Sequence, residues 1–149
     1  MEKLIPFTIN DLAKVTNHRS GEIKFGEKML TIPKGIDIAL FLKTCEAKYV
    51  LFGIPEDIGV RANFGRPGAA SAWECAIASI ANIQHNRFCK GNQILVLGRL
   101  NVCEEMKEVE HLDFNDIDDR SKLSQLVEKI DKDVSHIIFN IIKAGKTPI

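Results

Sequence analysis

Two arginines stand close together in a glycine-rich segment between Glu56 and Gly68. The guanidinium groups of Arg61 and Arg66 can each bind a carboxylate or a phosphate through two hydrogen bonds. The glycines of the segment permit backbone angles that other residues avoid, and a helix predicted just after Gly68 points its N-terminus, which favours anions, at the same loop. The segment is therefore a candidate site for an anion or a polar substrate. The alternative is structural: the arginines pair with Glu56 and Asp57 and hold the loop.

The chain contains no complete signature of a catalytic or metal site. The loop matches neither the G-x-x-x-x-G-K-[ST] phosphate loop nor the G-x-G-x-x-G dinucleotide motif. The cysteines form no C-x-x-C pair, and the histidines show no H-E-x-x-H spacing. A cluster of aspartates lacks the central glycine and the terminal glutamate of a calcium loop, so we expect it to cap a helix that begins near Ser121. Its members are Asp113, Asp116, Asp118 and Asp119. We assign no catalytic residue and no metal ligand within this chain.

Apolar runs predict the elements that position the loop. Residues 50–52 and 94–97 are short runs without polar alternation, the pattern of parallel strands buried on both faces. The segment between them is long enough for a crossover helix, and residues 69–82 have helical spacing with Trp73 on the apolar side. A longer helical pattern ends at Gly145, where a left-handed cap is expected, and a further strand is predicted from Thr147. These elements predict an α/β fold with a mainly parallel sheet.

Composition limits the expected partners and location. The chain has 149 residues, and its 20 Lys and Arg balance its 20 Asp and Glu. Nucleic acids and anionic membranes attract proteins with a basic excess, so we expect neither as a partner. The N-terminus lacks the basic and long apolar regions of a signal peptide, and no stretch approaches the roughly 20 apolar residues of a membrane span. We therefore expect a cytoplasmic protein.

The segment FGIPEDIGVRANFGRPGAA, which starts at Phe52, resembles the segment after the first core strand of the ureohydrolase superfamily, which includes arginase, agmatinase and formimidoylglutamase. It is most similar to the formimidoylglutamase branch, whose pattern runs as an acidic residue, x, Gly-Val-Arg, x-Asn, x-Gly-Arg, x-Gly-Ala. In the following helix, family members usually carry Gly-Pro and then an arginine, where this chain has SAWEC. The matching residues are Asp57, Gly59, Val60, Arg61, Asn63, Gly65, Arg66, Gly68 and Ala69.

The resemblance covers about residues 48–149 and implies the N-terminal part of an arginase-like domain there. Such a domain has three α/β/α layers around a mainly parallel sheet, and residues 1–47 would be a lineage-specific extension. The resemblance also implies that Arg61, Asn63 and Arg66 border the substrate site. In the family, two manganese ions activate a water molecule that attacks an amidine or guanidine carbon. The metal ligands come from Gly-Gly-x-His, Asp-Ala-His-x-Asp and late Asp-x-Asp motifs, and none of these occurs in the chain.

The resemblance therefore implies an incomplete ureohydrolase that holds no cofactor and is inactive alone, with two manganese ions in the full-length parent. The implied substrate is a small amidino or guanidino compound. N-formimidoyl-glutamate, hydrolysed to glutamate and formamide, is preferred, and arginine or agmatine is the alternative. A different interpretation is a stand-alone α/β binding or interaction domain without catalysis.

An incomplete sheet also predicts self-association. Without its later strands, the long helix would lack part of its packing surface and one sheet edge would stay open. We therefore expect a homo-oligomer. The helix residues expected to be left partly uncovered are Leu126, Ile130, Ile137 and Ile141.

Overall fold

The computed structural model describes residues 3–149, which form an α/β fold around one open, mixed sheet. The strand order is β1-β4-β3-β5, and β2 also pairs with β4. Every pairing is parallel except that of β1 with β4. The prediction of a mainly parallel sheet is confirmed, and the two predicted buried strands are the adjacent, parallel β3 and β4. The strands are β1 (Leu4–Pro6), β2 (Leu30–Thr31), β3 (Tyr49–Gly53), β4 (Ile94–Leu100) and β5 (Thr147–Pro148).

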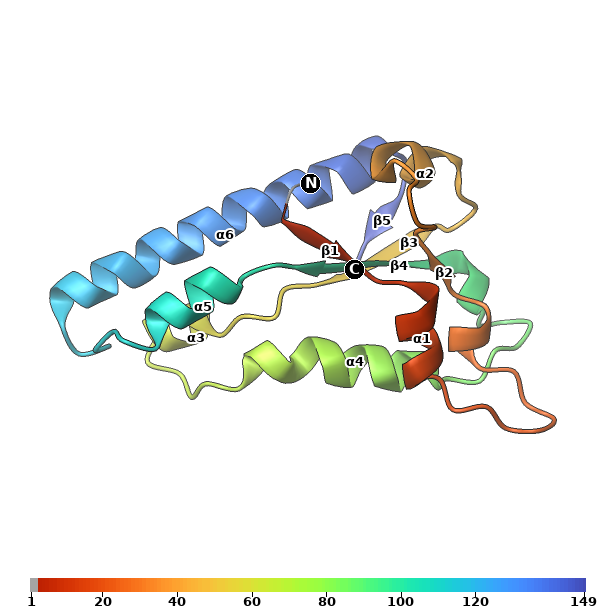
Figure 1. Cartoon of the computed structure of the whole chain (residues 1–149), viewed down its shortest axis with the longest axis horizontal. Coiled ribbons are helices and arrows are strands. Elements are labelled where there is room, and N and C mark those ends of the chain that lie inside the picture. Colours follow the sequence, from red (N-terminus) through yellow and green to blue (C-terminus); the bar gives the residue numbers. More distant parts are fainter. Residues whose placement is uncertain (1–2) are drawn as a thin grey trace.

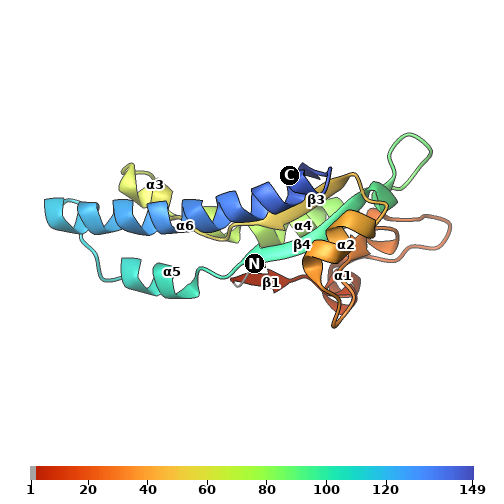
Figure 2. The ribbon, with the colours of Figure 1, turned by 90° about the horizontal axis from the view of Figure 1, so that it is seen from above.

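Helices lie on both sides of the two central strands. In Figure 1, α6 runs along one side of β3 and β4, and α4 lies on the other side with α1; Figure 2 shows the same ribbon from above. Among the helices of residues 3–149, none combines the length and the hydropathy that crossing a bilayer requires. The helices are α1 (Ile9–Val15), α2 (Ile38–Thr44), α3 (Ile58–Ala62), α4 (Ala72–Ala81), α5 (Cys103–Val109) and α6 (Ile117–Lys143).

Alternate residues of β3 and β4 enter two separate cores, because successive side chains of a strand point to opposite faces. Both strands are thus buried on both faces, as their uninterrupted apolar runs indicate. The α6 core contains Val50, Leu95 and Leu97 together with Leu123, Ile130, Ile137 and Ile141. The α4 core contains Leu51 and Val96 together with Leu12, Phe25, Trp73 and Ile77.

The apolar face of α6 is covered within this chain. Leu126, Ile130, Ile137 and Ile141 are 7%, 4%, 2% and 0% exposed, so the expectation that they lack packing partners is wrong. They pack against the strands, against α2 and α5 and against each other, in the larger core. The expectation of a homo-oligomer is therefore no longer supported by an uncovered helix face. It rests only on the open edge of the sheet at β5. Along the described chain, β5 pairs with β3 alone.

The ends of α6 follow from capping, although its start differs from the predicted one. Asp116 Oδ1 accepts hydrogen bonds from the backbone N–H groups of Asp118 (2.9 Å) and Asp119 (3.0 Å), so α6 begins at Ile117 rather than near Ser121. The predicted capping role of the aspartate cluster is confirmed. Gly145 has φ +74°, which is the left-handed cap that the sequence indicates.

The first part of the chain belongs to the same sheet, since β1 and β2 both pair with β4. Met1 and Glu2, which open the predicted extension 1–47, lie outside the described residues. Lys3 reaches Glu105 on α5, with Nζ 2.8 Å from Oε1, and Lys129 on α6 contacts the same oxygen at 2.9 Å. Burial alone would raise the pKa of Glu105, but the hydrogen bonds from both lysines outweigh it and lower this pKa to about 2. The charged carboxylate thus ties the start of the chain to α5 and α6.

Gly53 ends β3 directly under the ring of Trp73, and this contact yields a stability prediction. A Cβ at Gly53 would lie 2.3 Å from the nearest ring atom. We expect Gly53→Ala to lower the free energy of unfolding by about 1–3 kcal/mol in urea titrations, because the ring or the strand must shift. Gly59→Ala is the matched control: its nearest new contact is 3.8 Å away, and in a helix it should be neutral or stabilising by up to about 1 kcal/mol. Equal effects of the two substitutions would contradict this packing.

Candidate functional site

The segment between β3 and α4 leaves the carboxyl end of a buried strand, where ligands of open α/β sheets bind. The sequence predicts a loop here, but residues Ile58–Ala62 form the short helix α3. A single 3₁₀ turn at Ala69–Ser71 then leads into α4, which agrees with the helix predicted over 69–82. The segment is therefore folded over most of its length, with an exposed turn between α3 and the 3₁₀ turn.

Asp57 holds this segment together. Its side chain is buried, and its two oxygens accept hydrogen bonds from Arg61 Nε (2.8 Å) and from the backbone N–H of Gly68 (3.0 Å). The carboxylate thus joins α3 to the residue that precedes the 3₁₀ turn before α4, across eleven positions of the chain. Glu56 plays a more local part, since its side chain accepts one hydrogen bond from the N–H of Gly59.

Arg61 is mainly committed to the protein. Its side chain is 20% exposed, and in addition to the ion pair with Asp57 its guanidinium lies 5.6 Å from the ring centre of Phe114. Such a cation over an aromatic face is favourable. The structural alternative, in which the arginines pair with Glu56 and Asp57, is therefore correct for Arg61 and Asp57. The contact with Phe114 fixes α3 against the segment that precedes α6.

The turn after α3 depends on its local geometry. Asn63 donates from its side-chain nitrogen to the carbonyl of Gly59 (3.1 Å). Phe64 has φ +57°, a left-handed angle rare for a residue with a side chain, and Arg120 of α6 stacks on its ring at 4.6 Å. Gly65 follows where a Cβ would lie 2.6 Å from a side-chain carbon of Val60, so only glycine fits.

Arg66 is the arginine of the site that has no partner among residues 3–149. It lies in the exposed turn, and within residues 3–149 its guanidinium makes no hydrogen bond and no ion pair. Its donors are thus available to an anion from solution. The three predicted site residues share one short turn, but Arg61 and Asn63 are partly used by the fold and Arg66 is not.

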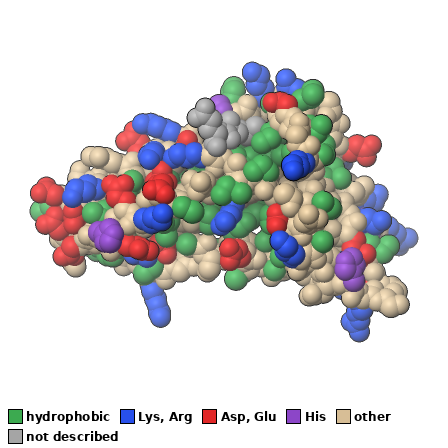
Figure 3. Space-filling view, viewed as in Figure 1, with side chains coloured by type: hydrophobic (Ala, Val, Ile, Leu, Met, Phe, Trp, Pro, Cys, Tyr) green, Lys and Arg blue, Asp and Glu red, His purple; other side chains and the backbone are tan. Residues whose placement is uncertain are grey.

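Acidic side chains and a small recess lie near the start of α6. Figure 3 shows acidic side chains gathered at the end of the molecule where α6 begins. Across the described part of the chain, no three His, Cys, Asp or Glu side chains come together as they would around a metal ion. A recess of about 210 Å³ lies between α3 and the first turns of α6, lined by Ala62, Ile117, Arg120, Ser121 and Ser124.

Comparisons with models of known protein families, with curated proteins and with solved structures find no match to this chain. The case for a family therefore rests on the residues of the loop and on their arrangement.

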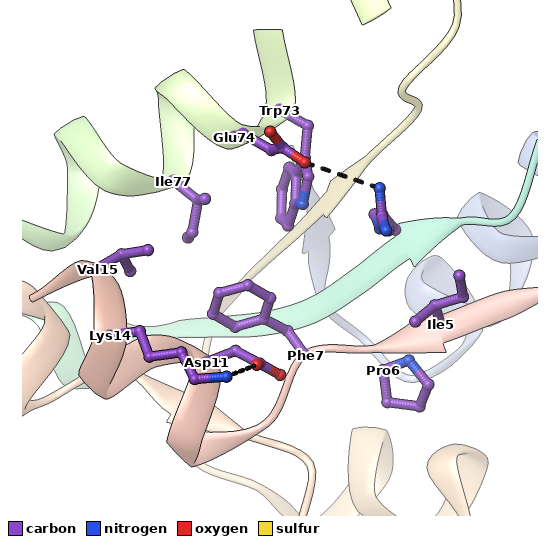
Figure 4. Close-up of a pocket in the computed structure, with 10 residues that line it drawn as sticks. Ile5, Pro6, Phe7, Asp11, Lys14, Val15, Trp73, Glu74 and Ile77 are labelled. Carbon is purple, nitrogen blue, oxygen red and sulfur yellow. Dashed lines mark hydrogen bonds and ion pairs between the residues drawn. The ribbon is translucent and has the colours of Figure 1, made fainter. Parts of the chain in front are cut away.

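A second candidate site was not predicted from the sequence. It is a pocket formed by β1, α1, α4 and β4, and Figure 4 shows the rings of Phe7 and Trp73 inside it. Trp73 was predicted to lie in the core, which its 7% exposure confirms, but its second role at a pocket wall was missed. One signal was present: a glycine inside a strand, here Gly98, often marks a bulge that redirects a side chain.

The two hydrogen bonds at Asp57 predict that this residue is needed for the stability of the loop. Asp57→Asn removes the charge that holds Arg61 and weakens the bond to Gly68, at a buried position. We expect a loss of about 2–4 kcal/mol in the free energy of unfolding. Glu56→Gln is the control, because the neighbouring carboxylate accepts one hydrogen bond and is partly exposed, and it should cost no more than about 1 kcal/mol. A loss below about 0.5 kcal/mol for Asp57→Asn would show that this carboxylate does not hold the loop.

Proposed function

We propose that the chain is the N-terminal part of a metal-dependent ureohydrolase. Its preferred substrate is N-formimidoyl-glutamate, with arginine or agmatine as the alternative. The observation that carries the proposal is the position of the ureohydrolase-like segment. The segment begins at the carboxyl end of β3. This strand lies beside the parallel strand β4 with helices on both sides, and α/β proteins bind ligands at the carboxyl ends of such strands. On this proposal α6 and α4 belong to the outer layers of an arginase-like three-layer domain, in a cytoplasmic protein.

The contacts inside the segment support this assignment. Residues of the resembling pattern account for its folded shape, since Asp57 bonds to Arg61 and Gly68, and Gly65 packs on Val60. The residues of the ureohydrolase-like pattern thus depend on one another for the folded shape of the segment. It builds a rigid support that presents the turn with Asn63 and Arg66 to solvent.

The role we assign to this chain is to position the substrate. Arg66 binds the carboxylate of the substrate, because its guanidinium has no other partner in the described structure. Asn63 accepts a hydrogen bond from a substrate N–H group through its side-chain oxygen, and Arg61 holds the turn through Asp57. The two manganese ions of the family would supply the activated water in the complete enzyme. The side chains of residues 3–149 do not form a site that fits these ions, so we derive no hydrolytic step for this chain.

The test compares substrates with and without a carboxylate, using the complete protein that contains this chain. We measure manganese-dependent hydrolysis of N-formimidoyl-L-glutamate, L-arginine and agmatine by the unchanged protein and by Arg66→Gln. We expect the substitution to raise KM for N-formimidoyl-L-glutamate at least about tenfold, which is the loss of roughly 1.4 kcal/mol expected for one charged hydrogen bond. KM for agmatine, which has no carboxylate, should change little.

A control variant separates this role from a general effect of charge. Arg87→Gln removes another exposed arginine, which lies over Phe88 in the connection before β4. It should leave all three KM values unchanged. Absence of hydrolysis of every substrate would contradict the ureohydrolase proposal and favour a binding domain. An equal effect of Arg66→Gln on agmatine would contradict the carboxylate contact.

A further inference from the structure

The pocket in Figure 4 has a volume of about 500 Å³, within the range of small-molecule sites. Its lining residues come from the paired strands β1 and β4 and from the helices α1 and α4, with Phe7 between β1 and α1. None of its lining residues belongs to the segment between β3 and α4 that carries the proposed function. It is therefore a separate site.

The middle of the pocket is apolar and aromatic. The rings of Phe7 and Trp73 meet edge to face, with centroids 6.0 Å apart and planes at 88°. Figure 4 shows both rings between Ile77 and Val15 on one side and Ile5 on the other. A flat or branched apolar group can pack against these rings and gain both burial and ring contacts.

A bulge in β4 turns Arg99 into this pocket. Val96 pairs with Leu51, but the next pair along is Gly98 with Phe52, so Leu97 is an extra residue in β4. The extra residue reverses the alternation of sides. As a result Leu100 joins the α6 core, and Arg99, which would otherwise face that core, lines the pocket beside Trp73.

Gly98 makes this bulge possible. It has φ +139°, and a Cβ there would lie 2.1 Å from the carbonyl oxygen of Ile5 on β1. No other residue fits such a position. The strand thus uses a glycine and a bulge to bring one cation to the rim of an apolar pocket.

Two acidic and two basic side chains surround the apolar middle, and within residues 3–149 one of the two pairs makes no hydrogen bond. Asp11 is used by α1: its carboxylate accepts from the hydroxyl of Thr8 (2.6 Å) and pairs with Lys14 at 3.4 Å. Glu74 and Arg99 face each other at 4.0 Å, too far for a hydrogen bond. Neither side chain donates or accepts a hydrogen bond within residues 3–149.

We propose that this pocket binds a free α-amino acid with an aromatic or branched apolar side chain. Arg99 takes the α-carboxylate through two hydrogen bonds, Glu74 takes the α-ammonium group, and the side chain packs against Phe7 and Trp73. The four charges around the pocket cancel, so the site suits a zwitterion better than an anion or a cation. The α-carboxylate and α-ammonium groups of the ligand lie side by side next to the Arg99–Glu74 pair, whose charges are 4.0 Å apart and are not joined by a hydrogen bond.

Trp73 reports directly on this site, because it is the single tryptophan of the chain. We titrate the protein with L-phenylalanine and follow tryptophan fluorescence, and we expect saturable binding with a dissociation constant on the order of 1 mM or below. Three analogues each lack one recognised group: 3-phenylpropionate has no ammonium, phenethylamine has no carboxylate, and glycine has no side chain. Each should bind at least about tenfold more weakly, the loss expected for one such contact.

Substitutions test the charged contacts. Arg99→Gln and Glu74→Gln should each weaken L-phenylalanine binding at least about tenfold, whereas phenethylamine should be insensitive to Arg99→Gln. The control is Arg19→Gln, which removes an exposed arginine that pairs with Glu22 at 3.4 Å, and it should bind as the unchanged protein does. Glu74 lies on the exposed side of α4 with 76% of its side chain accessible, so its variant tests the contact even if Arg99→Gln fails to fold.

Three results would overturn the proposal: no saturable fluorescence change with L-phenylalanine, equal affinity for 3-phenylpropionate, or equal affinity of Glu74→Gln and the unchanged protein. Each of these results is independent of the ureohydrolase test, because none of the substitutions lies in the turn with Arg66.

Discussion

The parallel pairing of β3 and β4 is the constraint on which the rest of the structure depends. Both strands are buried on both faces, so each must present apolar side chains to two cores at once. Val50 and Leu51 illustrate the result: the first packs under α6 and the second under α4. Because the strands end close to each other, the segment after β3 and the bulge of β4 come to the same end of the sheet.

Two local devices then turn this end of the sheet into candidate sites. After β3, the buried carboxylate of Asp57 joins α3 to the start of the next helix and leaves Arg66 in an exposed turn. In β4, the extra residue before Gly98 reverses the side on which Arg99 lies. The first device supports the proposed substrate contact, and the second supports the proposed amino-acid pocket. In both, backbone geometry places the arginine: within residues 3–149 Arg66 makes no hydrogen bond or ion pair, and Arg99 makes only a long ion pair with Glu74 at 4.0 Å.

The sequence predicted the elements whose signals are local. Short apolar runs gave the positions of β3 and β4, and Gly145 gave the end of α6. The short helices α3 and α5 were missed, because helices of five to seven residues are not stable alone and exist through contacts such as that of Arg61 with Phe114.

The missed features are those that unite distant residues. The covering of α6 could not be predicted, since it depends on which strands and helices of the same chain reach its face. The aromatic pocket joins residues near positions 7, 73 and 99, and no spacing in the chain links them. The turn with Arg66 could be predicted in part. Its residues were identified from their sequence pattern, but only the contacts in the structure show that Arg61 is bound to Asp57 and that Arg66 is available.

The central claim is that the turn is held in place by Asp57 before any ligand binds. Amide hydrogen exchange of the unliganded chain, resolved by residue, tests this most directly. We expect the N–H of Gly68, bonded to the Asp57 carboxylate, to exchange slowly, at a rate approaching that of the β3 and β4 amides. Exchange of the Gly68 N–H at the rate of an unstructured peptide would contradict it.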